Sequence, residues 1–120
     1  MFKFYFYANC DSCRKAMKFL NSRGVEYEKI PIRETPPCLE ELKTMLQFLN
    51  GNTRKLFNTS GQDYRKMNLK EKILTLSELE TLKLLTENGN LVKRPFVLGR
   101  DWGIVGFKET FWKEKWDNER

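Results

Sequence analysis

Two cysteines three positions apart, Cys10 and Cys13, are the residues whose type and spacing point most directly to chemistry. Residues 2–7, just before them, are almost continuously aromatic, which is typical of a strand that packs on both faces. Asn9 and Asp11 supply turn and helix-capping chemistry. An apolar stripe with helical spacing follows, formed by Cys13, Ala16, Met17 and Leu20. The pair is therefore predicted to lie where a buried strand becomes a helix.

The start of that helix favours a reactive thiolate. Its first backbone N–H groups are unpaired and its dipole attracts negative charge, so we expect the pKa of Cys10 to fall below the ordinary thiol value of about 8.5. Arg14 and Lys15 add positive charge nearby. Cys13, one turn along, can attack a mixed disulfide on Cys10 and release it as an internal disulfide. The stretch is predicted to be a redox-active site with Cys10 as nucleophile and Cys13 as resolving thiol.

Three other roles for the pair are open at this point. A structural zinc site needs about four Cys or His ligands, whereas the chain has no His and only one further cysteine, Cys38. A permanent disulfide would close a very short loop and constrain the unfolded chain little. Two ordinary buried thiols would be inert. Redox chemistry is favoured because Cys-x-x-Cys between an apolar strand and a helix is a fairly specific signal. We expect no metal, and Cys38 is interpreted as an incidental thiol.

Composition sets the remaining bounds. With 120 residues, 40% hydrophobic and 32% charged, the chain is predicted to form one domain, residues 1–120. The formal charge of +6 comes from scattered Lys and Arg residues, so we expect a solvated surface and no direct nucleic-acid contact. Neither a long apolar stretch nor a leader-like segment is found, which predicts no membrane contact. Three cysteines, an odd count, favour the cytoplasm over secretion, and we expect a monomer.

Strand and helix signals alternate along the chain. After the first helix, which is predicted to end at Gly24, residues 25–30 alternate apolar and charged side chains, as a half-exposed strand does. A strand, helix and strand this close together predict a parallel pair with a right-handed crossover. The later predicted elements are a helix over 39–49, a turn at 54–57, a brief helix at 62–67, a helix opened by the capping box Ser77–Glu80, a hairpin of strands 96–98 and 102–106, and a helix over 108–116.

This order predicts the fold class. It is β-α-β, then a helical insertion at about 36–90, then β-β-α, which resembles an α/β, thioredoxin-like mixed sheet flanked by helices. In such folds a cis-proline that opens the third strand faces the thiol at the end of the first helix. Pro95 occupies the matching place, so it is predicted to be cis and to shape the site, although few X–Pro bonds are cis.

Four motifs in the right order resemble the arsenate reductase (ArsC)/Spx family over essentially the whole chain. The matching stretches are Cys10-Asp11-Ser12-Cys13-Arg14-Lys15-Ala16, Asn58-Thr59-Ser60-Gly61-Gln62-Asp63-Tyr64-Arg65, Arg94-Pro95-Phe96-Val97 and Val105-Gly106-Phe107-Lys108-Glu109. The resemblance implies the thioredoxin-like fold. It is less decisive about activity, because this family spans enzymes and non-enzymes.

For the glutaredoxin-coupled arsenate reductases, the resemblance implies that Cys10 attacks arsenate and that arginines stabilise the oxyanion. Glutathione and then glutaredoxin reduce the adduct. Arg94 matches one of those arginines, and its guanidinium fork suits an oxyanion. Where the enzymes have two further arginines, this chain has Asn58 and either Phe107 or Lys108. Because one lost donor typically costs about 2.7–4 kcal/mol, efficient arsenate reduction is not expected.

The resemblance also implies a regulatory alternative. Spx-type proteins carry Cys-x-x-Cys followed by Arg-Lys-Ala, use the pair as a redox switch, and bind the C-terminal domain of the RNA polymerase α subunit. Gly51 falls near the glycine of that contact in Spx. A plain helix C-cap is the favoured interpretation of Gly51.

We therefore expect a cytoplasmic thiol-based oxidoreductase, of the arsenate-reductase or thiol-disulfide type, with no bound cofactor. Its substrate would be a small oxyanion or disulfide, with glutathione as co-substrate and glutaredoxin or thioredoxin as reductant. The Spx-like regulator is the alternative. The expected catalytic residues are Cys10, Cys13 and Arg94, and the expected substrate contacts are Asn9, Arg14, Pro95 and Lys108.

Overall fold

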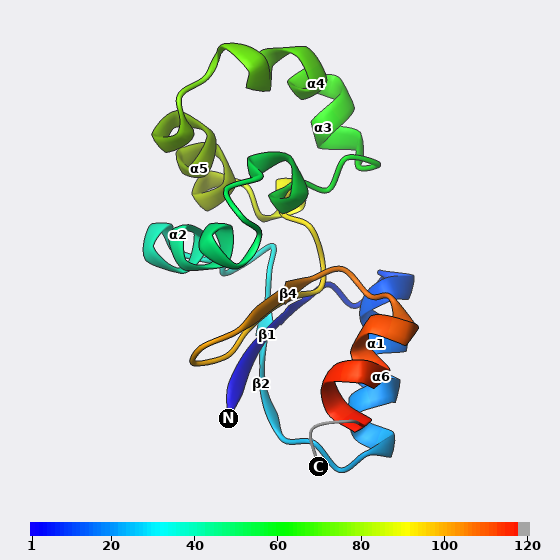
Figure 1. The fold of residues 1–120 in the computed structure, drawn as a ribbon. Helices are drawn as coiled ribbons and strands as arrows, with labels where there is room; N and C mark the ends of the chain where they lie inside the picture. The colour runs from blue at the N-terminus through cyan, green and yellow to red at the C-terminus, as the bar shows by residue number, and fades with distance from the viewer. Residues whose placement is uncertain (118–120) are drawn as a thin grey trace.

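The computed structural model describes residues 1–117, and its centre is a four-stranded mixed sheet in the order β2-β1-β3-β4 (Figure 1). The central strand β1 (Phe2–Phe6) pairs in parallel with β2 (Tyr27–Pro31) and antiparallel with β3 (Phe96–Leu98). The edge strand β4 (Gly103–Val105) pairs antiparallel with β3. The predicted parallel unit, hairpin and thioredoxin-like mixed sheet are confirmed.

Neighbouring side chains of β1 enter two different cores, because successive residues of a strand point to opposite faces. Phe4 packs on the face covered by α1 (Asp11–Ser22) and α6 (Glu109–Asp117), which lie on one side of the sheet in Figure 1. Tyr5 packs on the opposite face with Phe96 and with helices from the segment between β2 and β3. Since both faces of β1 are covered, a one-residue slip would exchange the two cores, and the register is fixed.

Helical elements occupy the chain between β2 and β3, where the sequence predicts the insertion. The capping box is confirmed, because the Ser77 hydroxyl accepts the Glu80 N–H at 3.1 Å and the Glu80 carboxylate accepts the Ser77 N–H at 2.8 Å. Two short elements, α4 and η2, were not predicted, because three charged residues in a row interrupt the apolar spacing there. The elements are α2 (Leu39–Phe48), η1 (Thr53–Leu56), α3 (Gln62–Lys66), α4 (Leu69–Lys72), η2 (Ile73–Thr75), α5 (Glu78–Glu87) and η3 (Gly89–Leu91).

The return from the insertion to the sheet depends on Gly89. A Cβ at this position would lie 1.9 Å from the carbonyl oxygen of Ile32 and 3.0 Å from the Cα of Arg33. The chain just before β3 therefore passes directly against the chain just after β2, and only glycine fits. Among the helices of residues 1–117, none combines the length and the apolar character needed to cross a membrane.

Candidate active site

Cys10 and Cys13 lie at the N-terminus of α1, immediately after β1 ends. Cys10 is the N-cap residue, with an extended backbone, and its side chain is half-buried. Cys13, in the first turn, is fully buried. Asn9 lies in the turn before the helix, as predicted, but the expected capping by Asn9 and Asp11 is wrong, because Cys10 itself holds the N-cap position. Solvent and substrate can therefore reach Cys10, while Cys13 lies behind it.

The surroundings of Cys10 lower its pKa to about 5. The largest cause is the Cys13 side chain, which donates a hydrogen bond to the Cys10 sulfur; burial acts in the opposite direction. The backbone N–H of Cys13 and the guanidinium of Arg94 also donate to the sulfur, and the charge of Arg94 lowers the pKa further. Arg14 and Lys15, which the sequence suggested as the activating cations, are not among these causes. A thiol with this pKa is a thiolate at neutral pH.

The pKa of Cys13 shifts the other way and lies far above the ordinary thiol range. Its hydrogen bond to Cys10 is the largest cause, since losing the proton would also lose that bond, and burial adds to it. The N–H of Tyr7 donates to the Cys13 sulfur at 3.5 Å, which partly offsets these effects. The two thiols are thus divided into an ionised, accessible sulfur and a protonated, buried one.

Arg94 reaches the thiol from the turn that opens β3. The Arg94–Pro95 peptide is cis, as predicted, and Pro95 is buried. The Arg94 guanidinium carbon lies 4.8 Å from the centre of the Tyr7 ring. Arg33 also lies 4.8 Å from that centre and donates to the Tyr7 hydroxyl at 2.8 Å. Tyr7 therefore holds Arg94 by a cation–π contact and is itself held by Arg33.

Tyr7 and Arg33 are site residues that the sequence argument missed. Tyr7 was read as the end of an aromatic strand, yet its carbonyl accepts the N–H of Cys10 at 3.1 Å and its own N–H points to Cys13. A tyrosine hydroxyl three residues before the first cysteine was a usable signal. Arg33 had none, because only the close chain approach at Gly89 brings it beside the segment that carries Arg94.

The predicted substrate contacts Asn9, Arg14 and Lys108 have different surroundings from Arg94. Asn9 is exposed in the turn before α1. Arg14 forms an ion pair with Asp11 and donates to the carbonyl of Ala8 at 3.3 Å, so its charge is engaged on the outer side of the helix. Lys108 lies just before α6 and lines a separate cavity. Pro95 follows Arg94, which donates to the Cys10 sulfur, whereas Asn9 and Arg14 adjoin the two cysteines through the backbone.

The other positions compared with oxyanion-binding arginines are Asn58, which has no charge, and either Phe107 or the cation Lys108, which lines the separate cavity. Asn58 donates its backbone N–H to Leu91 at 2.7 Å, and its side chain accepts from Ser60 at 3.4 Å. Phe107 packs edge-on against Phe19 and Trp112, inside the aromatic core beneath α6. Of the three positions compared with arginines, Arg94 is the one whose guanidinium contacts the Cys10 thiolate. Nowhere in residues 1–117 do three Cys, His, Asp or Glu side chains gather as a metal site would require.

Comparison with known proteins places this arrangement in a family. The family model described as "ArsC family" matches residues 5–114. The uncharacterized protein YusI of Bacillus subtilis is 46% identical over 113 residues, 94% of this chain and 96% of that protein. The crystal structure of "a possible arsenate reductase" from Streptococcus mutans is 32% identical, with a TM-score of 0.88 over 97% of this chain and 98% of that one.

A regulator is also among the relatives. The global transcriptional regulator Spx of Streptococcus agalactiae is 30% identical over 101 residues, which are 84% of this chain and 72% of Spx. Similarity therefore extends to one protein described as a possible enzyme and to one described as a regulator. By the match over residues 5–114 and by these relatives, the chain belongs to the ArsC family.

Proposed function

We propose that this protein is a cytoplasmic thiol-disulfide oxidoreductase in which Cys10 is the nucleophile and Cys13 the resolving thiol. One observation carries the proposal: the half-buried Cys10 sulfur, whose pKa is lowered, lies beside the fully buried Cys13 thiol, whose pKa is raised. That division of roles is what a two-cysteine exchange reaction needs. Arg94 stabilises the attacking thiolate, and Pro95 fixes the turn that delivers Arg94.

In the first step the Cys10 thiolate attacks one sulfur of a substrate disulfide. A new S–S bond joins Cys10 to that sulfur, the substrate's own S–S bond breaks, and the other substrate sulfur leaves as a thiolate that takes a proton from water. Negative charge thereby moves from Cys10 to the leaving sulfur. Arg94, which donates to the Cys10 sulfur, lies where the charge is shared in the transition state.

In the second step Cys13 attacks the Cys10 sulfur and releases the second substrate thiol. The Cys10 thiolate is the main reason that Cys13 holds its proton. Once Cys10 is in a mixed disulfide that charge is gone, so Cys13 can lose its proton to the departing sulfur and attack. The product is a Cys10–Cys13 disulfide, which an external dithiol such as glutaredoxin or thioredoxin, or two molecules of glutathione, returns to the dithiol by the reverse exchange.

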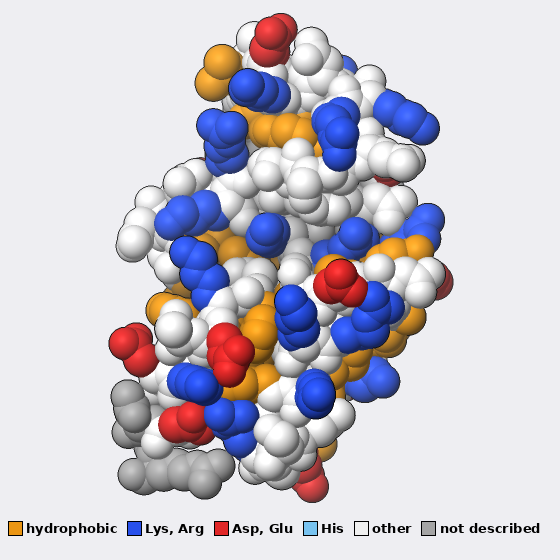
Figure 2. Space-filling model, turned by 90° about the vertical axis from the view of Figure 1, so that its right-hand side faces the viewer, with side chains coloured by type: hydrophobic (Ala, Val, Ile, Leu, Met, Phe, Trp, Pro, Cys, Tyr) orange, Lys and Arg blue, Asp and Glu red, His pale blue; other side chains and the backbone are white. Residues whose placement is uncertain are grey.

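A disulfide is favoured over arsenate as the substrate. Arsenate needs several donors around its oxygens, and this site offers one guanidinium, from Arg94. Asn58 supplies no charge, and the third position holds either Phe107 or Lys108, whose ammonium lacks a planar fork. By the usual cost of one oxyanion donor, each missing arginine lowers the rate about 10²- to 10³-fold. Lys and Arg side chains are spread across the middle of the face on the α1 and α6 side (Figure 2), which favours a substrate of negative charge.

Single-turnover assays test the proposal. With the protein reduced beforehand and then separated from the reductant, we expect stoichiometric reduction of hydroxyethyl disulfide, none by Cys10→Ser, and accumulation of the mixed disulfide in Cys13→Ser. The matched control is Cys38→Ser, because Cys38 is exposed and lies at the N-cap of α2, and it should retain full activity. Absence of any Cys10-dependent turnover, with either a disulfide or arsenate, would refute the assignment.

The second candidate is an Spx-like regulator, favoured by the 30% identity to Spx across most of this chain. It would sense oxidation through the same thiol pair and bind the C-terminal domain of the RNA polymerase α subunit. Gly51 follows α2 with a φ of +78°, and its N–H donates to Leu46 at 2.9 Å, a helix-capping geometry that leaves the residue exposed. A pull-down of the α C-terminal domain that is negative with both reduced and oxidised protein would remove this candidate.

A further inference from the structure

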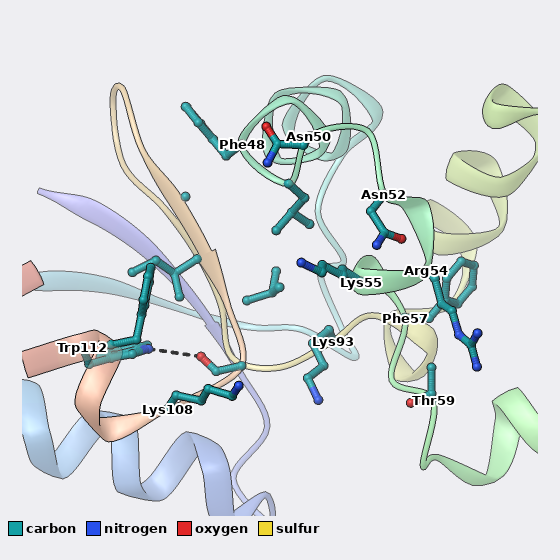
Figure 3. Close-up of a pocket in the computed structure, with 16 residues that line it drawn as sticks. Phe48, Asn50, Asn52, Arg54, Lys55, Phe57, Thr59, Lys93, Lys108 and Trp112 are labelled. Carbon is teal, nitrogen blue, oxygen red and sulfur yellow. Dashed lines mark hydrogen bonds between the residues drawn. The ribbon is translucent and has the colours of Figure 1, made fainter. Parts of the chain in front are cut away.

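A cavity of about 630 Å³ lies apart from the thiol pair, between β4, the start of α6 and the segment that joins α2 to α3 (Figure 3). Its volume falls in the range of sites for small organic ligands, about 300–1,000 Å³. Cys10, Cys13 and Arg94 do not line it. The cavity therefore needs an explanation of its own.

The cavity has cations on several sides and no acidic lining residue. Arg54, Lys55, Lys93 and Lys108 line it, and no Asp or Glu does. Within residues 1–117, none of these four forms an ion pair with a carboxylate. In Figure 3, Lys55 extends into the space from the η1 side, while the ammonium groups of Lys93 and Lys108 lie along the lower rim. Like charges held around one hollow focus a positive potential that an anion would relieve.

Aromatic side chains supply the apolar part of the lining. Phe57 and Trp112 are buried, and the indole N–H of Trp112 is already used, donating to the Gly106 carbonyl at 3.2 Å. Phe48 and Phe111 are 37% and 53% exposed, which is unusual for rings of this size. Two partly exposed rings beside a cationic hollow can contact the flat face of a ligand ring.

Two glycines of the cavity wall leave room for these side chains. A Cβ at Gly106 would come within 3.1 Å of the Cε of Lys93, and one at Gly103 would come within 2.6 Å of the Met45 sulfur and 3.0 Å of Phe48. Gly106 also has a φ of +76°, a conformation that disfavours other residues. Lys93 and Phe48 are thus seated against bare backbone, so the cationic and the aromatic parts of the cavity both depend on this strand and the turn after it.

We propose that this cavity binds a small organic anion that carries two or more negative charges and a planar ring, the chemistry of a nucleoside phosphate. The charged groups would lie among Lys55, Lys93 and Lys108, and the ring against Phe48 or Phe111. Two charges are required because one would leave most of the cations unneutralised. Charge without a ring would leave the exposed aromatic surface uncovered.

Calorimetric titration of the reduced protein with three probes tests this. We expect adenosine diphosphate to bind at least about tenfold more tightly than adenosine, which lacks the charge, and than pyrophosphate, which lacks the ring. Its affinity should fall as salt is raised. Amide signals of Gly103 and Gly106 should shift in NMR spectra on binding, while that of Cys13 should not.

Lysine variants locate the site. Lys55→Gln and Lys93→Gln should each weaken adenosine diphosphate binding about tenfold, whereas Lys70→Gln, an exposed lysine of α4 outside the cavity, should have no effect. Circular dichroism checks that each variant is folded. The proposal is overturned if adenosine diphosphate does not bind, if adenosine or pyrophosphate binds as tightly, or if Lys70→Gln weakens binding as much as Lys55→Gln and Lys93→Gln do.

Discussion

Replacement of Cys13 by Ala should raise the pKa of Cys10, because the Cys13 side chain is the largest cause of its low value of about 5. A hydrogen bond to a charged group contributes about 1.5–3 kcal/mol, which corresponds to roughly 1–2 pH units. Since the Cys13 N–H and Arg94 remain in place, the expected pKa in the variant is about 6–7 and not the ordinary value of about 8.5.

Cys13→Ser is the matched variant, because its hydroxyl can still donate to the Cys10 sulfur. Cys13→Ser should keep the pKa of Cys10 near 5. If the pKa changed only because the packing around Cys13 was disturbed, Cys13→Ala would not show a higher Cys10 pKa than Cys13→Ser. The measurement is the pH dependence of alkylation of Cys10 by iodoacetamide, followed by mass spectrometry. All proteins should carry Cys38→Ser, because Cys38 is exposed and would react as well.

Two results would refute this reasoning. A midpoint near 8.5 when Cys13 is present would mean that the helix terminus, Cys13 and Arg94 together do not activate the thiol. An equal midpoint in Cys13→Ala and Cys13→Ser would mean that the hydrogen bond is not the cause. Arg94→Gln should also raise the pKa of Cys10, since both the charge of Arg94 and its hydrogen bond to the sulfur lower that pKa.

Further predictions concern stability, measured by urea unfolding of the reduced protein. Gly89→Ala should destabilise the fold far more than Gly51→Ala. A Cβ at Gly89 would lie 1.9 Å from the Ile32 carbonyl oxygen, whereas a Cβ at Gly51 would have no neighbouring atom within 4 Å. Ser77→Ala should cost about 0.5–2 kcal/mol through loss of the α5 cap, and Ser77→Gly less. As pH falls from about 8.5 towards 5, stability should decrease, because the unfolded Cys10 takes up a proton before the folded one; Cys10→Ser should flatten this slope.

The sequence was sufficient for the fold where a pattern is local. The aromatic run before Cys10, the leucine spacing of α2 and the Ser77 box each identify an element without help from the rest of the chain. Elements held by tertiary contacts left no such pattern. The four-residue helix α4 begins after Asn68, whose φ is +52°, and it is held by Leu69, which is fully buried in the core of the insertion.

For the site, chain proximity was predictable and side-chain direction was not. Motif position identified Cys10, Cys13 and Arg94, which the structure brings together. Arg14 is near Cys10 in sequence, but its position on α1 turns it towards Asp11. Arg33 is more than twenty residues from Cys10 and reaches the site through Tyr7, a relation that depends on two backbones meeting and has no sequence signature.

For the disulfide exchange proposed above, the contacts of Tyr7 account for the use of a single arginine. Its backbone fixes both cysteines, through the Cys10 N–H to its carbonyl and its own N–H to the Cys13 sulfur, while its ring holds Arg94. A single strand terminus therefore positions the nucleophile, the resolving thiol and the cation together. In disulfide exchange the negative charge is shared among sulfur atoms that lie in line with Cys10, so one guanidinium beside Cys10 can stabilise it. Arsenate would place charge on several oxygens around the sulfur, which needs donors from more directions than Tyr7 can hold in place.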